Sequence, residues 1–308
     1  MSEFKGEFAI DVSELRKSFD GREIIKDISL KVPKGEIYGF LGPNGAGKTT
    51  TIRLICGLLT PDHAKGQVLG YDVLTQSSQI RKKVGYMTQK FSFWNDLTIK
   101  ENLEFTASVY EIKNKKEKVE QTLVNLGLKD RQNQLTAGLS GGWKQRLALA
   151  ACILHEPEIL LLDEPTAGVD PKARREFWDE LSRLSESGIT VLVSTHYMDE
   201  AERCHELVYI AAGQVMVKGS VKSVIEQTNL FSLILNGENL TELSQIISQN
   251  DLVTTTAMFG QNLRICGENF ANLEQICESY KDKFNLSCQN GETLLEDAFI
   301  YYLKKAKK

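Results

Sequence analysis

The chain has 308 residues, of which 42% are hydrophobic and 25% charged, and its formal net charge is −4 at pH 7. This length suits an α/β core with a smaller appended domain, and the composition excludes a disordered chain and a fibrous repeat. Because the chain is mildly acidic, its net charge gives no long-range attraction for nucleic acid or anionic lipid. A local basic patch could still exist, so the net charge by itself identifies no partner. We expect no nucleic-acid partner on the architecture described below.

No stretch reaches the roughly 18 consecutive apolar residues that a bilayer-spanning helix needs. Residues 1–11 carry Glu3, Glu7 and Asp11 among their apolar residues, which is unlike a signal peptide. These features predict a cytoplasmic chain that does not itself cross a membrane. The cysteines show no C-x-x-C pair and no zinc-ligand spacing, which predicts reduced, mostly buried thiols. They are Cys56, Cys152, Cys204, Cys266, Cys277 and Cys288.

The first elements predict a strand, a glycine-rich loop and a helix in series. Residues 24–32 alternate like a strand at an antiparallel edge, and Pro33 to Gly35 form a turn. A short apolar run at 37–41 predicts the next strand, and 50–56 predict a helix closed by Gly57. Two later apolar runs, 159–162 and 190–194, flank a helical segment and suit a parallel sheet covered on both faces.

Between these strands the pattern becomes helical. Residues 101–110 and 113–126 predict two helices, and we interpret about 91–155 as a helical subdomain. The pattern changes again after about residue 220. The order strand 231–235, helix 240–247, strands 253–258 and 263–266, helix 271–280 and strand 284–288 predicts a small α+β domain over 221–308, of ferredoxin-like type. A last helix is expected at 294–303.

The glycine-rich loop carries the most specific motif. Residues 42–49 satisfy G-x-x-x-x-G-K-[ST] between an expected strand and an expected helix, as a phosphate-binding P-loop requires. Backbone N–H groups and the helix N-terminus would hold phosphate oxygens, Lys48 would neutralise the β and γ phosphates, and the Thr49 hydroxyl would ligate Mg²⁺. The expected ATP-binding residues are Gly42, Pro43, Asn44, Gly45, Ala46, Gly47, Lys48, Thr49 and Thr50.

Two carboxylates follow the apolar run at 159–162. Asp163 and Glu164 would lie at the edge of the sheet where open α/β folds bind ligands. Asp163 can hold Mg²⁺, and Glu164 is placed to polarise an attacking water. Without another motif, Asp163 and Glu164 would predict only a turn with acidic residues. Together with the P-loop they predict nucleotide hydrolysis.

Leu139-Ser140-Gly141-Gly142 precedes a helix, and Ser140 is a good N-cap. The order of the motifs gives this segment a second interpretation. From about Phe8 to Ser220 the chain resembles the ATP-binding cassette (ABC) family: the P-loop is followed by Gln89, the Leu-Ser-Gly-Gly signature, Leu-Leu-Leu-Asp-Glu-Pro, Asp170 and His196. The expected fold is therefore an ABC cassette over 1–220, a RecA-like P-loop NTPase core with an antiparallel β edge and a helical subdomain.

The resemblance implies a role for several residues. Phe19 lies where the family has an aromatic that stacks on adenine, although it could instead be a core residue. Gln89 would sense the γ-phosphate and Mg²⁺, His196 would contact the γ-phosphate as a catalytic switch beside Glu164 and Lys48, and Asp170 would connect the two sites. The other histidines are interpreted as structural: His63, His155 and His205.

The resemblance also implies partners. Signature residues Ser140, Gly141 and Gly142 of one cassette cap the ATP held by another, so hydrolysis needs a second cassette, in a homodimer or a heterodimer. Trp143 departs from the family, which most often has Gln there, and we expect activity to survive the change. An ABC transporter further needs integral membrane permease subunits, which would hold this chain at the inner face of the membrane.

The ending, residues 294–299, is similar to the drug-export-like (ABC-2 type) branch, which favours export. The alternative is a soluble ABC ATPase acting on ribosomes or DNA, but the single cassette, the missing coiled coil and the acidic balance disfavour it. A GTPase is disfavoured because Asn114-Lys115-Lys116-Glu117, the nearest approach to a guanine-reading motif, lies in a charged helical run. The transported substrate cannot be identified from the sequence.

Overall fold

A computed structural model describes residues 7–306; residues 1–6, part of the segment judged unlike a signal peptide, lie outside this range. The chain divides into two compact units, Met1–Val215 and Met216–Lys308. The division falls inside a strand, a few residues before the expected boundary at residue 220. No helix among the described residues is long and apolar enough to span a bilayer.

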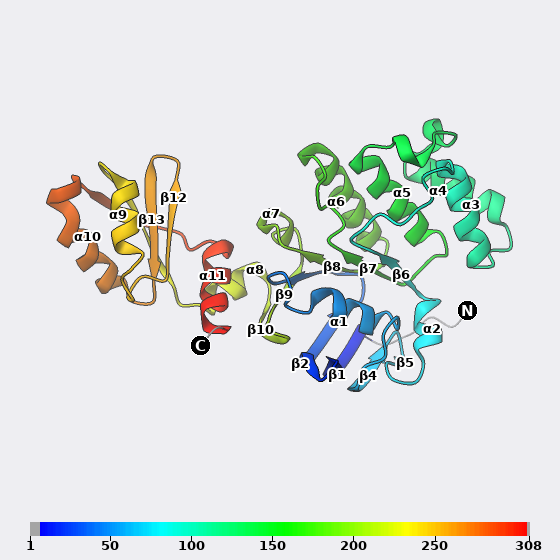
Figure 1. The fold of residues 1–308 in the computed structure, drawn as a ribbon, viewed down its shortest axis with the longest axis horizontal. Coiled ribbons are helices and arrows are strands. Elements are labelled where there is room, and N and C mark those ends of the chain that lie inside the picture. The colour runs from blue at the N-terminus through cyan, green and yellow to red at the C-terminus, as the bar shows by residue number, and fades with distance from the viewer. Residues whose placement is uncertain (1–6, 307–308) are drawn as a thin grey trace. The chain divides into compact units, whose positions relative to one another are not determined.

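The first unit contains two sheets (Figure 1). The larger has the strand order β10-β9-β3-β8-β7-β6, and the pairs that involve β3, β6, β7 and β8 are parallel. Its strands β3, β7 and β8 are buried along their whole length, which agrees with the apolar runs at 37–41, 159–162 and 191–193. Its strands are β3 Ile37–Leu41, β6 Val84–Met87, β7 Ile159–Asp163, β8 Thr190–Thr195, β9 Glu206–Ala211 and β10 Gln214–Gly219.

The smaller sheet is antiparallel, in the order β2-β1-β4-β5. It is the antiparallel edge that the sequence predicted, but β2 pairs with β1, while β3 after the turn enters the other sheet. Its strands are β1 Phe8–Phe19, β2 Arg22–Pro33, β4 His63–Val68 and β5 Tyr71–Asp72. Helix α1, Lys48–Ile55, packs into one core with both sheets through Ile52, Leu54 and Ile55.

Helices α5 and α6 lie on the other side of the parallel sheet from α1 (Figure 1). Helix α3 begins with a capping box between Thr98 and Glu101, and α6 begins at Pro171 with Asp170 as its N-cap. The remaining helical elements of this unit are α2 Ser77–Arg81, α3 Ile99–Val109, α4 Lys115–Asn125, η1 Lys129–Arg131, η2 Thr136–Gly138, α5 Gly141–Ile153, α6 Pro171–Glu186 and α7 Met198–Ala201.

The second unit is built on an antiparallel sheet of order β12-β13-β11-β14, and its main elements run βαββαβ. Helices α9 and α10 pack on one face of the sheet, where Leu233, Leu235, Leu263 and Ile265 point into the core. The elements are α8 Val221–Glu226, β11 Phe231–Asn236, α9 Leu240–Ile247, β12 Thr255–Phe259, β13 Asn262–Gly267, α10 Phe270–Phe284, β14 Ser287–Gly291 and α11 Leu295–Ala306.

Asp297 of α11 contacts the opposite face of this sheet. Its side chain is 2% exposed and lies 3.4 Å from the Arg264 guanidinium. Arg264 lies between Leu263 and Ile265 in β13, so its side chain points to the other face of the sheet from theirs. The Asp297 carboxylate also accepts hydrogen bonds from the Thr255 hydroxyl and the Leu294 backbone N–H. The buried ion pair therefore fixes α11 against the sheet.

The cysteine prediction was wrong for one pair. Cys277 of α10 and Cys288 of β14 form a disulfide, whereas Cys56, Cys152, Cys204 and Cys266 are buried thiols. No motif or spacing marks Cys277 and Cys288 as a pair, because only the packing of α10 against the sheet brings them together.

Candidate functional site

The P-loop connects β3 to α1, as the sequence predicted. Gly42 has a φ of 154°, and a Cβ there would lie 2.1 Å from the Ile210 carbonyl oxygen. Gly47 has a φ of 102°, and a Cβ there would lie 2.5 Å from the Ile25 side chain. A side chain at either position would displace the loop from the neighbouring strands, so these glycines are needed for the shape of the loop.

The P-loop lines a cavity of about 630 Å³. Its lining includes Phe19, Pro43 to Thr50, Gln89 and Glu164, so the fold brings most of the expected ATP-binding residues together. Phe19 is 42% exposed, which is unlike a core residue. Gly42 is buried beneath the loop and does not line the cavity.

Glu164 is the residue on which the expected catalytic groups converge. Its carboxylate lies 3.6 Å from the Lys48 ammonium and 3.4 Å from Nδ1 of His196, and it accepts a hydrogen bond of 2.9 Å from the Gln89 amide. Glu164 has a φ of 47°, a left-handed conformation that is unfavourable for a residue with a Cβ. Its backbone N–H donates to the Ser194 hydroxyl at 2.9 Å, which holds this conformation at the end of β7.

Lys48 is 5% exposed, and its ammonium donates hydrogen bonds to the carbonyls of Gly42 and Pro43. Burial lowers the pKa of Lys48, and the nearby carboxylates of Glu164 and Asp163 oppose that shift without cancelling it. A phosphate group in the cavity would add negative charge beside the buried ammonium and so stabilise its charged form.

Mg²⁺ fits the donors at this site. Asp163 is buried and accepts a hydrogen bond of 2.8 Å from the Ser194 hydroxyl. Thr49 and Gln89 line the P-loop cavity, whereas Asp163 does not. The Thr49 hydroxyl, the Gln89 amide oxygen and the Asp163 carboxylate are all hard oxygen donors, which Mg²⁺ prefers. Within residues 7–306 no three His, Cys, Asp or Glu side chains form a cluster that could hold a metal ion. A bound Mg²⁺ would therefore need nucleotide oxygens to complete its coordination.

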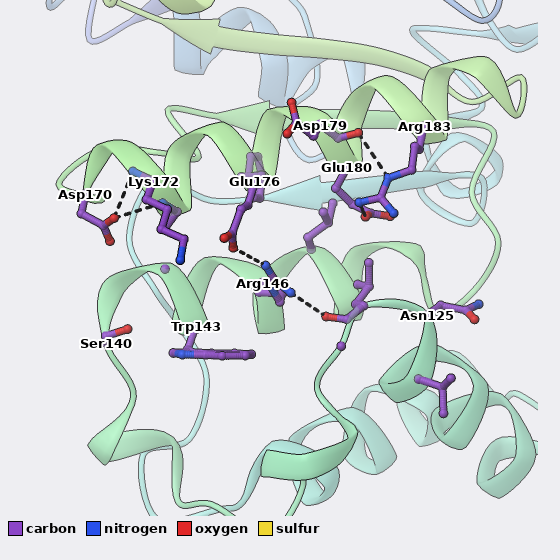
Figure 2. A pocket seen from close by; sticks show the side chains of 17 residues that line it. Asn125, Ser140, Trp143, Arg146, Asp170, Lys172, Glu176, Asp179, Glu180 and Arg183 are labelled. Carbon is purple, nitrogen blue, oxygen red and sulfur yellow. Dashed lines mark hydrogen bonds and ion pairs between the residues drawn. The ribbon is translucent and has the colours of Figure 1, made fainter.

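A second cavity, of about 580 Å³, lies between α5 and α6 (Figure 2). Ser140, Gly142, Trp143 and Asp170 are among its lining residues, and none of the residues of this cavity also lines the P-loop cavity. The fold thus separates the signature and Asp170 from the P-loop. Gly141 begins α5 and is exposed.

Ser140 occupies the N-cap position of α5, but its side chain makes no capping hydrogen bond. The helix N-terminus and the exposed Ser140 hydroxyl are thus both available to an anion. Asp170 differs, because its carboxylate accepts hydrogen bonds from the backbone N–H groups of Lys172 and Ala173 and caps α6 (Figure 2).

The sequence analysis missed some residues of both cavities. Arg22 and Ile24 line the P-loop cavity, but nothing in the alternating strand pattern marked them. In the second cavity, the Arg146 guanidinium lies 5.2 Å from the Trp143 ring and pairs with Glu176 at 2.8 Å. The Arg131 guanidinium, which is not among the lining residues, lies 4.6 Å from the same ring. Trp143 and Arg146 are three residues apart in α5, whereas Arg131 and Glu176 come from η1 and α6, so only the fold reveals these last two partners.

Comparison with known proteins agrees with the resemblance to the ABC family that the sequence motifs indicated. The family model described as "ABC transporter" matches residues 25–167. Nod factor export ATP-binding protein I of Rhizobium leguminosarum bv. viciae is 34% identical over 300 residues, covering 95% of this chain and 94% of that protein. The probable multidrug ABC transporter ATP-binding protein YbhF of Escherichia coli (strain K12) is 44% identical over 217 residues, covering 70% of this chain but 38% of YbhF.

The chain thus spans less than two fifths of the length of YbhF. Among solved structures, a dimeric ATP-binding cassette in a post-hydrolysis state, bound to ADP and Pi, superposes with a TM-score of 0.62 at 26% identity, covering 68% of this chain and 98% of that one. Sequence and structure agree, and the match to the export ATP-binding protein extends over nearly the full length of both chains. This chain belongs to the ABC transporter family.

Proposed function

We propose that this chain binds Mg-ATP in the P-loop cavity and hydrolyses it, as the ATP-binding subunit of an exporter with separate integral membrane subunits. The observation that carries this proposal is the convergence of Lys48, Gln89 and His196 on the Glu164 carboxylate at a cavity lined by the P-loop. A buried strand end supplies the carboxylate, and the glycine-rich loop supplies backbone N–H groups for phosphate.

Binding uses the P-loop and the aromatic beside it. The loop amides and the Lys48 ammonium hold the phosphates, and the exposed Phe19 ring offers a face for adenine. Thr49, Gln89 and Asp163 would hold Mg²⁺, which neutralises phosphate charge when bound.

Hydrolysis uses Glu164 as the base that orients and polarises the attacking water. We propose that the imidazole of His196, which lies 3.4 Å from that carboxylate, contacts the γ-phosphate. Gln89 bonds to the same carboxylate, so a movement of the Gln89 loop would alter the base directly. This contact offers a route by which a partner protein could couple to the chemistry.

The separation of the two cavities supports a paired arrangement. Ser140 and Gly142 line a cavity that shares no residue with the P-loop cavity. We infer that the signature acts on ATP held by a second cassette, either another copy or a similar chain. The likeness to a dimeric cassette supports this inference.

Export through membrane subunits is supported by the relatives, one of which is named as a Nod factor export protein and another as a probable multidrug transporter protein. Since no described helix can span a bilayer, the permease would be a separate protein that holds this chain at the inner face of the membrane. Affinity purification of the full chain from solubilised membranes should recover an integral membrane protein. Recovery with ribosomes or DNA instead, in a salt-sensitive manner, would contradict the transporter assignment.

The active site is tested by Glu164→Gln in the full chain. We expect ATP affinity to remain and hydrolysis to fall by more than about a hundredfold, because the base is lost while the P-loop that binds the phosphates is unchanged. An ATP-bound dimer of cassettes should then accumulate. Glu202→Gln, an exposed glutamate of the same unit, serves as the matched control. Repeated turnover near the wild-type rate in Glu164→Gln would remove Glu164 from its role.

A further inference from the structure

Glu200 is a buried carboxylate that neither cavity contains. It is 1% exposed, in the short helix α7, shortly after the loop that carries His196. A buried carboxylate is costly unless each oxygen has a partner. Both oxygens do: Oε1 accepts a hydrogen bond from the Thr166 hydroxyl, and Oε2 accepts one of 2.5 Å from the Thr195 hydroxyl.

A cation completes this cluster. Nε of Arg174 lies 3.5 Å from Glu200 Oε1, an ion pair rather than a hydrogen bond. Arg174 also lies 3.6 Å from Asp199, and its guanidinium stacks 4.1 Å from the centre of the Tyr197 ring. Arg174 therefore contacts the segment after β8 in two ways: through the carboxylates of Asp199 and Glu200, and through the face of the Tyr197 ring.

The three partners of Glu200 come from three segments of the catalytic apparatus. Thr166 lies two residues after Glu164, and Thr195 lies immediately before His196. Arg174 lies in the first turns of α6, which Asp170 caps. One carboxylate thus contacts the segment that follows Glu164, the end of β8 that precedes His196, and helix α6 that follows Asp170.

The contact with Thr195 extends to the backbone beside the histidine. The Tyr197 N–H donates to the Thr195 hydroxyl oxygen at 3.0 Å, while the Thr195 hydroxyl donates to Glu200. The His196 ring packs on the Tyr197 ring at 4.2 Å. The chain of contacts from Glu200 therefore reaches His196 through the backbone on one side and through the Arg174–Tyr197 stack on the other.

We propose that Glu200 is a positioning residue, which fixes His196 against the Glu164 carboxylate through Thr195, Thr166 and Arg174. This inference rests on the proposed hydrolysis of ATP. Glu200 touches neither cavity, so its loss should spare ATP binding and slow the chemical step. A residue that serves only the stability of the fold would instead lower the folded fraction and leave kcat per folded molecule unchanged.

The test measures kcat, KM and ATP affinity of the full chain. Glu200→Gln removes the charge that pairs with Arg174 and sets an amide NH₂ against a hydroxyl donor. We expect kcat to fall about tenfold while ATP affinity changes less than about twofold. The matched control is Glu202→Gln, the same substitution two residues away at an exposed side chain, which should keep wild-type kcat.

A second variant reaches the same contact without changing Glu200. Thr195→Val removes the hydroxyl between Glu200 and the Tyr197 N–H, and it should lower kcat in the same way, so it carries the test if Glu200→Gln does not fold. Thr122→Val is its control, because Thr122 is also buried and donates to a backbone carbonyl, but lies in α4. We expect wild-type kcat in that control.

A double-mutant cycle separates positioning from a general effect. In the His196→Ala background, adding Glu200→Gln should cost less than about threefold in kcat, because the residue that it positions is already gone. A tenfold loss in both backgrounds would overturn the proposal, as would wild-type kcat in both Glu200→Gln and Thr195→Val. If the wild-type chain itself hydrolyses no ATP, the proposed function fails instead, so the two failures are distinguishable.

Discussion

Glu164 in the first unit and Asp297 in the second are both carboxylates beside a buried cation, and the two pairs are nearly equal in length. The Lys48–Glu164 distance is 3.6 Å and the Arg264–Asp297 distance is 3.4 Å. Their surroundings differ. Glu164 is 11% exposed at the edge of a cavity, whereas Asp297 is 2% exposed beneath a helix.

The difference lies in what each pair can do once it is formed. Lys48 and Glu164 face a space where a phosphate or a water can enter, and Glu164 sits on a strained backbone. The Asp297 carboxylate contacts Arg264 and accepts hydrogen bonds from Thr255 and the Leu294 N–H, so its partners all come from the fold itself. A buried ion pair is therefore evidence for a reactive site only where it borders a cavity.

The largest effect in this comparison is expected from Asp297→Ala. Removing the carboxylate leaves the Arg264 guanidinium buried and unpaired, so the free energy of unfolding of the second unit should fall by about 3–5 kcal/mol. Hydrogen exchange of peptides from the second unit measures this loss. Because all three tryptophans lie in the first unit, tryptophan fluorescence should show that unit unchanged.

The control for that substitution is Glu296→Ala, the exposed neighbour in the same first turn of α11. It should cost less than about 1 kcal/mol, since it removes a solvated helix-end charge. The double change Asp297→Leu with Arg264→Met should restore most of the stability, because it buries no unpaired charge. A loss below about 1 kcal/mol in Asp297→Ala would mean that the pair does not hold α11.

In the Lys48–Glu164 pair, which borders the cavity, Lys48→Met keeps the buried aliphatic stem and removes the ammonium. ATP affinity should fall by about 2–3 kcal/mol, or roughly 30- to 150-fold, since the phosphates lose a charged donor. Calorimetric titration with Mg-ATP measures the loss, and the exposed Lys82→Met is its control. Unchanged affinity would show that the cavity holds phosphate through the loop amides alone.

The sequence predicted the local parts of the first site well, for a physical reason. A P-loop is a continuous segment, and its glycines, its lysine and its flanking strand and helix are all fixed by neighbours in the chain. The same holds for the helix that begins after Ser140, although the sequence suggested a side-chain cap that the structure does not show. In the second unit, alternation and helical spacing likewise gave the order of strands and helices.

Contacts between distant segments could not be predicted in this way. Ser194 binds both Asp163 and the Glu164 backbone, yet its sequence context is that of any buried strand end. Glu200 resembles a solvated acid at the start of a helix until Thr166 and Arg174 arrive from other elements. Pairing of this kind depends on strand order and helix packing, which periodicity does not encode.

A smaller effect is expected from Phe19→Ala. Base–aromatic stacking contributes about 1–3 kcal/mol, and since Phe19 is 42% exposed we expect the lower part of that range, a loss of about five- to thirtyfold in ATP affinity. Affinity for inorganic tripolyphosphate should stay the same, because that ligand has no base. Phe259→Ala, an exposed aromatic of the second unit, is the control. Equal losses of affinity for both ligands would mean that Phe19 maintains the shape of the cavity and does not stack on the base.

The smallest effect is expected from Trp143→Gln. The Trp143 ring contacts the guanidinium groups of Arg131 and Arg146, and each such contact at a partly exposed site is worth about 0.5–1 kcal/mol. Ser140 and the α5 N-terminus would remain in place, so kcat and KM for ATP should change by less than about threefold. Steady-state hydrolysis over a range of ATP concentrations measures both. A rise in KM beyond tenfold would show that the indole itself contacts nucleotide, in addition to the Ser140 and Gly142 contacts that we propose.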